Sequence, residues 1–334
     1  MKGRLFINSK PYRLAKTMKH LIKDAHGGNA GYIAMAGNID AGHQTYSGSP
    51  IPVFYFGVIE GLGNTISNLT VTGPGDNGGT GLVGFLESEI EEPVPVIRDL
   101  GLLSVNISSN VSRDWVGALA GISVGTIEYS YSTGTVSVSG AQAHAGGLVG
   151  GSGGNIVDSY SSAAVSGADQ VTGVGGLAGE TATECGPCFG FTSHSYATGP
   201  VIGGDGVMVG GLVGENLSGW IDNSYATGPV TGGSNSFVGG FIGGNTNAPP
   251  PDTAHSMLTN VYSTGTVTAG SGAALGGLIG EDIAVSPVIN DTYWDLDTSG
   301  VSDPSQGTGN IANDPGITGL TDAQLKSALP AGFD

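Results

Sequence analysis

Apolar and polar positions alternate over short stretches along most of this chain. The valines Val165, Val201, Val230 and Val267 each lie five residues after a tyrosine in such a stretch. Alternation with a period of two predicts short, half-buried β-strands. No segment after residue 27 keeps a helical period over ten residues, so the pattern predicts an all-β fold.

The strands belong to tandem repeats, each marked by two short sequence blocks. The first block reads Gly-Gly-Leu-Val-Gly or a close variant, and its central residues are Leu82, Leu119, Leu148, Leu177, Leu212, Phe241 and Leu278. The second reads Ser-Tyr-Ser/Ala-Thr-Gly or a close variant, and its tyrosines are Tyr131, Tyr160, Tyr196, Tyr225 and Tyr262, with Tyr293 as a degenerate sixth. Self-similarity at this period is the signature of a solenoid.

One arc of the repeat has a fixed length and the other absorbs every insertion. From each tyrosine to the next central Leu or Phe the distance is 16 or 17 residues, whereas the return distance varies from 12 to 21 residues. If each repeat is one coil, equivalent residues stack about 4.8 Å apart and the tyrosines form a ladder. We therefore expect a single-stranded parallel β-helix, right-handed, with about seven to nine coils.

The two ends of such a coil need caps, because open coils expose unpaired strand edges. Residues 12–25 place Leu14, Met18, Leu21 and Ile22 on one helical face, which predicts an amphipathic cap helix. Its basic face is a solvated surface or, as an alternative, a contact for a membrane or polyanion. At the other end Thr321-x-x-Gln324 predicts a capping box and a short helix. The expected domains are a cap at 1–27, a solenoid at 28–300 and a closing segment at 301–334.

Composition excludes several classes of protein. The chain has 62 glycines in 334 residues, yet 39% of its residues are apolar, which disfavours disorder. Seven of its ten bases precede residue 24; the remainder carries only Arg98, Arg113 and Lys326 against 28 acids. Such a surface repels phosphate backbones, so we expect no nucleic-acid partner. No stretch has the length of a membrane span, so we expect no membrane insertion.

The two blocks resemble the GLUG repeat family of large bacterial surface adhesins, filamentous-haemagglutinin-like proteins and some surface peptidases. Residues 31–40 and 56–69 resemble its leading coils, and residues 292–295 and 319–325 its closing segment, so the likeness covers roughly residues 28–330. The resemblance implies an extracellular or bacterial cell-surface scaffold that binds a glycan or a protein on another surface and adjoins further domains. Members usually continue past the closing segment, so we expect this chain to be truncated there.

The segment Cys185-Gly186-Pro187-Cys188 matches the Cys-Gly-Pro-Cys motif of a thioredoxin active site, which lies at a helix N-terminus. Here it falls in a repeat insertion, Glu184 precedes it, and no base lies near to stabilise a thiolate. We expect a loop-clamping disulfide or a plain thiol pair. Redox catalysis is one alternative. The other is a metal site, which would need two more ligands, with His194 as a possible third.

Catalysis is not expected, although many parallel β-helices cleave acidic polysaccharides. Lyases of that kind need a basic residue, and hydrolases need paired carboxylates, whereas the acids here fall mostly in loops and not at stacked positions. The chain has no H-E-x-x-H motif, and its six histidines are scattered, as surface or loop residues would be. We expect no cofactor. Bound Ca²⁺ is the alternative, because residues 203–206 weakly match a calcium-binding repeat.

Three insertions make the best candidate binding site. They span residues 87–96, 181–192 and 244–257, on the same arc of the first, fourth and sixth coils, and insertions on one face of a repeat protein often form its binding surface. The candidate residues are Glu87, Glu89, Glu91, Glu92, Asn245, Asn247, Asp252 and His255. The alternatives are an edge that merely tolerates loops, a polysaccharide-active enzyme, an ice-binding threonine ladder interrupted by Pro200 and Pro229, and a plain structural stalk.

Overall fold

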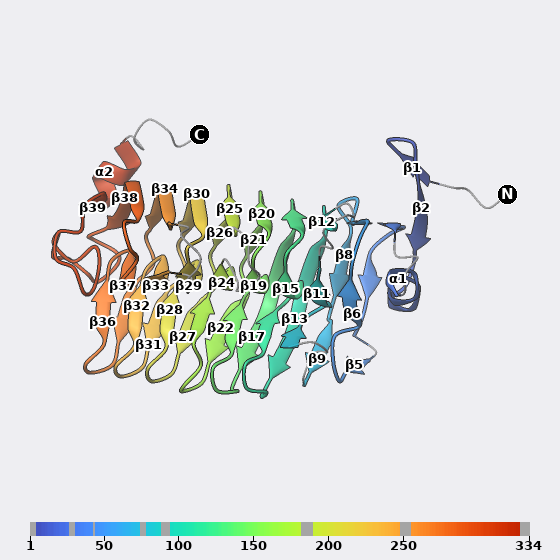
Figure 1. Ribbon diagram of the computed structural model, residues 1–334, viewed down its shortest axis with the longest axis horizontal. Coiled ribbons are helices and arrows are strands. Elements are labelled where there is room, and N and C mark those ends of the chain that lie inside the picture. The colour runs from blue at the N-terminus through green and yellow to red at the C-terminus, as the bar shows by residue number, and fades with distance from the viewer. Residues whose placement is uncertain are drawn as a thin grey trace.

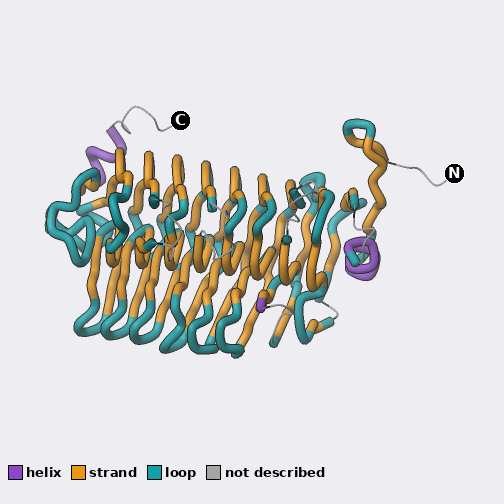
Figure 2. The backbone as a smooth tube through the Cα atoms, viewed as in Figure 1, coloured by secondary structure: helices purple, strands orange, loops and turns teal. Residues whose placement is uncertain are grey.

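The computed structural model describes residues 5–26, 31–42, 44–73, 78–87, 94–181, 190–247 and 255–327. These residues form an elongated solenoid in which coil follows coil along one axis, with the N-terminus at one end and the C-terminus at the other (Figure 1). Figure 2 shows the same succession of strands and turns in coil after coil. The predicted all-β parallel β-helix is confirmed; its right-handed winding stays a prediction.

Three sheets run along the axis, and their strands pair in parallel except in the N-terminal hairpin. The seven-stranded sheet contains β10 (Gly79–Thr80), β14 (Trp115–Gly117), β18 (His144–Gly146), β23 (Gly173–Gly175), β28 (Met208–Gly210), β32 (Phe237–Gly239) and β36 (Ala274–Gly276). The eight-stranded sheet contains β6 (Ile51–Phe54), β11 (Val83–Leu86), β15 (Ala120–Ser123), β19 (Val149–Ser152), β24 (Ala178–Thr181), β29 (Val213–Leu217), β33 (Ile242–Thr246) and β37 (Ile279–Asp282). These strand numbers agree with the predicted seven to nine coils.

The third sheet has 24 strands because many coils contribute two or three short strands to it. Its first half contains β1 (Leu5–Ile7), β2 (Lys10–Ala15), β3 (Tyr32–Met35), β4 (Ile39–Asp40), β5 (Thr45–Tyr46), β7 (Val58–Glu60), β8 (Thr65–Ser67), β9 (Thr70–Thr72), β12 (Val96–Arg98), β13 (Gly101–Ser109), β16 (Thr126–Glu128) and β17 (Tyr131–Val138). Its second half contains β20 (Asn155–Val157), β21 (Tyr160–Ser161), β22 (Ala164–Gly167), β25 (Phe191–Ser193), β26 (Tyr196–Ala197), β27 (Val201–Gly203), β30 (Trp220–Ala226), β31 (Val230–Gly232), β34 (Met257–Ser263), β35 (Val267–Ala269), β38 (Val288–Asp295) and β39 (Ile317–Leu320).

Glycine in the first block lets successive coils approach at backbone distance. A Cβ on Gly147 would collide with the carbonyl oxygen of Gly176, and one on Gly176 with that of Gly211. The leucine that follows points inward, and Leu148, Leu177 and Leu212 are fully buried. The block therefore makes a sharp, tightly stacked corner between the seven- and eight-stranded sheets.

The Ser-Tyr block makes a second corner. The residue before its serine has a left-handed backbone, as at Asp158 and Asn223, with φ of 47° and 43°. The serine hydroxyls link adjacent coils. For example, Ser159 Oγ accepts a hydrogen bond from the backbone N–H of Ser130 at 3.1 Å. The predicted tyrosine ladder is confirmed: the rings of the five block tyrosines stack in succession, with centroids 4.7 to 5.1 Å apart.

The N-terminal cap differs from the prediction. Helix α1 spans Met18–Ala25, with Thr17 as its N-cap, and does not begin at Tyr12. The chain before it forms strand β2, which pairs with β1 in a hairpin and with β3 in parallel, so Leu14 is 37% exposed instead of lying on a helical face. Pairing with the first coil satisfies backbone groups that a helix there would leave unpaired at the sheet edge. The shortened α1 still packs against β3 and β6.

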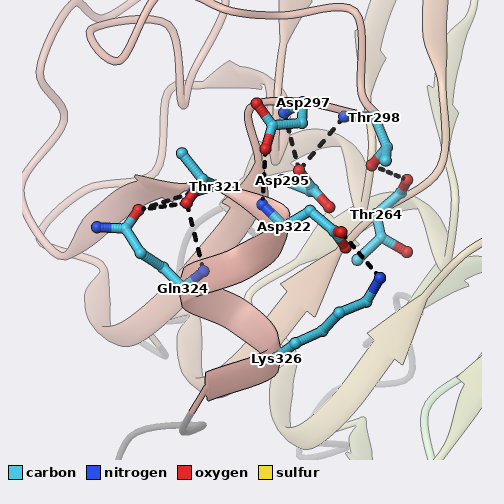
Figure 3. Close-up of polar contacts among 8 residues, drawn as sticks. All are labelled: Thr264, Asp295, Asp297, Thr298, Thr321, Asp322, Gln324 and Lys326. Atoms are coloured by element: carbon cyan, nitrogen blue, oxygen red, sulfur yellow. Dashed lines mark hydrogen bonds and ion pairs between the residues drawn. The ribbon is translucent and has the colours of Figure 1, made fainter.

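The C-terminal helix α2 (Asp322–Ser327) begins with the predicted capping box. Thr321 N–H donates to Gln324 Oε1 at 2.8 Å, and Gln324 N–H donates to Thr321 Oγ1 at 3.3 Å (Figure 3). Asp297 Oδ2 accepts from the N–H of Asp322, which ties the helix to the turn after β38 (Figure 3). The domain boundaries at residues 27 and 300 stay predictions.

Candidate functional site

The three insertions leave the solenoid at one edge. They follow β11, β24 and β33 of the eight-stranded sheet and precede β12, β25 and β34 of the 24-stranded sheet. The register of the eight-stranded sheet places Leu86, Thr181 and Asn245 in one column, so the insertions emerge in line along the axis. We call this line the insertion edge. Glu89, Glu91, Glu92, Asp252, Cys185 and Cys188 lie outside the described residues.

Asn245 belongs to the interior, so its predicted place on the binding edge is wrong. It is fully buried in an inward-facing polar column with Thr181, Asn216 and Asp282. Thr181 Oγ1 donates to Asn216 Oδ1 at 2.6 Å, Asn216 Nδ2 to Asn245 Oδ1 at 2.9 Å, and Asn245 Nδ2 to Asp282 Oδ1 at 3.1 Å. We call these four side chains the internal polar ladder. The side chain of Asn245 is therefore held inside the solenoid and cannot reach a ligand at this edge.

Asn247 and His255 do lie at the insertion edge, where they hold the next coil's loop. Asn247 Nδ2 donates to Ile283 O at 3.1 Å, and Asn247 Oδ1 accepts from Val285 N–H at 2.8 Å. His255 Nδ1 lies 2.9 Å from Val285 O. Ile283 and Val285 are thereby presented to solvent with 55% and 64% of their surface exposed. Glu87 is half-buried, and its N–H donates to Phe54 O.

A column of apolar side chains runs along the same edge. Phe191, Trp220, Met257 and Val288 are in register as the first residues of β25, β30, β34 and β38. Trp220 and Val288 are 44% and 43% exposed. In earlier coils the same column carries Val58 and Val96, then the polar Thr126 and Asn155, so it is apolar without interruption only from the fourth coil on. We call Phe191, Trp220, Met257 and Val288, with Ile283 and Val285, the edge apolar strip.

The sequence analysis missed the edge apolar strip, although a signal was present. Phe191, Trp220, Met257 and Val288 each open the strand that follows a turn or insertion, at a position that is polar in two earlier repeats, at Thr126 and Asn155. Exposed apolar side chains that gather in one place usually mark an interaction surface. The strip is therefore the feature of the insertion edge best suited to contact a partner.

A second cluster lies where the seven- and eight-stranded sheets meet. His144 Nε2 is 3.1 Å from Glu180 Oε2 and 3.6 Å from Glu215 Oε2. Trp115 stacks on the His144 ring with centroids 5.6 Å apart, and its Nε1–H donates to Glu180 Oε2 at 3.3 Å. Thr246 Oγ1 donates to Glu215 Oε1 at 3.0 Å. We call His144, Glu180 and Glu215 the groove triad.

Two sequence expectations fail at the groove triad. His144 is only 7% exposed, so it is neither a surface nor a loop residue. Glu180 and Glu215 pair in register on adjacent strands, so acids do occupy stacked positions in this chain. Glycines leave space for these side chains. Gly151, in the preceding coil, pairs with Glu180, and Gly173, in the following coil, pairs with His144. Strand register, which spacing alone does not fix, brings the three side chains together.

Glu180 and Glu215 are poorly placed for glycan hydrolysis. Glu180 is 5% exposed and Trp115 lies against it, which leaves no access for a sugar ring. Another residue of the same column, Glu281, is half-buried, and burial raises the pKa of its carboxyl.

The segment 203–206, which weakly matches a calcium-binding repeat, has a structural role. Asp205 Oδ1 accepts from Ser234 N–H at 2.6 Å in the following coil, and Asp205 N–H donates to Asp169 Oδ1 at 2.9 Å in the preceding coil. These contacts stack the turns of successive coils on one another.

Comparison with known proteins supports the fold and the repeat type. Residues 234–268, which include the block tyrosine Tyr262, match the GLUG motif. No curated protein matches the chain. A crystal structure titled as a putative immunoglobulin A1 protease from Bacteroides ovatus aligns with a TM-score of 0.60 and 19% identity, over 96% of this chain and 87% of that one. Neither helix in the described part of the chain is long and apolar enough to cross a membrane.

Proposed function

We propose that this chain is a non-catalytic binding and display module of a secreted or cell-surface protein. Its partner would be a glycan or a protein on another surface, and its flanks would join neighbouring domains of a larger surface protein, as in filamentous-haemagglutinin-like adhesins. The GLUG motif supports this type of scaffold. The observation that carries the proposal is the edge apolar strip, which lies beside the insertions and not on the fixed arc.

Aromatic and aliphatic side chains with this exposure suit a binding role. Trp is enriched among the residues that dominate binding energy at interfaces, because a large rigid ring buries much surface at little entropic cost. Trp220 occupies the middle of the strip, between Phe191 and Met257 in adjacent coils. A flat ring there can lie against a sugar face or an apolar peptide side chain.

The protease activity named for the structural neighbour is not proposed for this chain, because H-E-x-x-H is absent from its sequence. The polysaccharide-active enzyme remains the second candidate, on the strength of the stacked pair Glu180 and Glu215. Their burial favours a structural role over contact with substrate.

A combined binding and turnover screen tests the proposal. The chain is applied to arrays of glycans and of extracellular proteins, and the same glycans are incubated with it, with and without Ca²⁺, and analysed for shortened products. We expect specific binding to at least one surface and no turnover. Turnover of any glycan would overturn the non-catalytic proposal, and an absence of binding on both arrays would favour a plain stalk.

A further inference from the structure

The groove triad has one property that packing alone does not explain. His144 is only 7% exposed, yet among the described residues neither of its ring nitrogens has a hydrogen-bond partner of good geometry. Glu180 Oε2 lies only 3.1 Å from Nε2, so it is near enough but lies off the direction of an N–H bond. A buried ring nitrogen left this way is costly unless something else satisfies it.

We propose that the groove triad binds a divalent transition-metal ion of the Zn²⁺ class. His144 Nε2 and one carboxylate oxygen each from Glu180 and Glu215 would be the protein ligands. Ligands of one ion point at the ion and not at one another, which accounts for the offset between Nε2 and Glu180 Oε2.

The distances suit a shared ion. With Zn–N and Zn–O bonds of about 2.0–2.2 Å in tetrahedral geometry, two ligand atoms lie about 3.3 Å apart. The separations of His144 Nε2 from the two glutamates, 3.1 and 3.6 Å, bracket that value. All three ligand atoms lie within 4.8 Å of one another. The side chain of Glu215 is 15% exposed, so it has freedom to close the remaining gap.

Residues around the triad already orient its carboxylates. Trp115 donates to Glu180, and Thr246 donates to Glu215 Oε1, which turns Glu215 Oε2 toward His144. Such outer contacts are typical of metal sites, where they fix ligand orientation and raise affinity. The Trp115 ring also covers one face of His144 and limits its rotation.

The donor set selects the ion. Imidazole with two carboxylates suits Zn²⁺ and neighbouring transition metals, whereas Ca²⁺ takes six to eight oxygen ligands. Charge agrees, because a divalent cation balances two carboxylates beside a neutral imidazole. The fixed cations after residue 23 make contacts elsewhere: Arg98 with Glu60, Arg113 with Gln142 and Lys326 with Asp322.

The consequence of binding would be mechanical. His144, Glu180 and Glu215 lie on β18, β24 and β29, strands of three successive coils. One ion would therefore fasten three coils together, independently of what the insertion edge binds.

The test is metal binding by the whole chain after removal of metals with a chelator. Zn²⁺ titration by calorimetry and metal analysis of the dialysed protein should give one ion per chain, with Ca²⁺ failing to compete. With Co²⁺ as a probe, visible absorption should report a site of low coordination number with nitrogen ligation.

Variants separate this site from the other candidates. His144→Ala and Glu215→Gln should each weaken Zn²⁺ binding by about 100-fold or more, and Trp115→Phe, which keeps an aromatic ring but deletes the indole N–H, by about tenfold. Glu281→Gln is the matched control, because Glu281 lies in the same column as Glu180 and Glu215 but, among the described residues, belongs to no cluster with a histidine. It should bind like the parent chain.

Two results would overturn the proposal. One is the absence of stoichiometric Zn²⁺ binding by the parent chain. The other is binding that survives Glu215→Gln but disappears in a Cys185→Ser, Cys188→Ser variant, which would place the ion at the cysteine pair. Glu215 is the more exposed ligand, so its variant should fold even if His144→Ala does not, and circular dichroism checks this.

Discussion

Replacing Asn216 by alanine is expected to lower the free energy of unfolding by about 3 kcal/mol, because one side chain serves several buried partners. Asn216 accepts from Thr181 Oγ1 and from Gly219 N–H, and donates to Asn245 Oδ1. Each buried polar group left without a partner costs about 1–3 kcal/mol. The substitution also breaks the internal polar ladder in its middle, so neighbouring coils lose contact at the base of two insertions.

Urea unfolding followed by circular dichroism and tyrosine fluorescence measures this effect. Asn155→Ala is the control, because Asn155 is exposed and its side chain donates only one long hydrogen bond within the described part of the chain, from Nδ2 to Thr126 Oγ1 at 3.4 Å. It should change stability by less than about 0.5 kcal/mol. Equal losses for the two variants would show that the ladder does not hold the coils together.

The second large effect is expected at Gly211, the second glycine of a first block. In Gly211→Ala the new Cβ would collide with the backbone carbonyl of Gly240 in the next coil, and backbone cannot rotate away as a side chain can. Separating two coils locally also strains the hydrogen bonds on either side. We expect a loss of about 3 kcal/mol or more, or failure to fold.

Gly206→Ala gives the informative contrast. Gly206 has φ of +72° and open space around the position of a Cβ, so alanine there meets conformational strain of about 1–2 kcal/mol but no clash. Gly211 is not in that backbone region, so its sensitivity comes from close approach alone. A larger thermal destabilisation by Gly206→Ala than by Gly211→Ala would contradict this account of the first block.

Repetition made most of the fold predictable from sequence. A feature that recurs at Tyr131, Tyr160 and Tyr196 needs one structural explanation for all its copies, and stacked coils supply it. The fixed and variable arcs likewise located the insertion edge. The capping box at Thr321 is a local contact between near neighbours in the chain, so its sequence pattern is sufficient.

Features that occur once, or that depend on register, could not be predicted in the same way. On β19, Val149 pairs with Ala178 and Gly151 pairs with Glu180, but Gly150 between them has no partner in the register. Alternation of apolar and polar residues therefore does not predict which side chains of this strand face inward. For that reason the sequence predicts an edge position for Asn245, which is buried. His144, expected with the other histidines at the surface or in a loop, is likewise buried on β18. The predicted helix at 12–25 wrongly includes residues 12–15 of strand β2, because so few residues cannot distinguish a helical period from a strand period.

The central claim is that recognition belongs to the insertion edge and not to the fixed arc. The direct measurement compares binding, on the arrays that detect the parent chain, by Trp220→Ala and by Ile202→Ala. Both side chains are exposed, at 44% and 52%, but Ile202 lies on β27, between Tyr196 and Leu212 and therefore on the fixed arc. We predict at least a tenfold loss of affinity for Trp220→Ala and none for Ile202→Ala; equal affinity of both variants and the parent chain would contradict the claim.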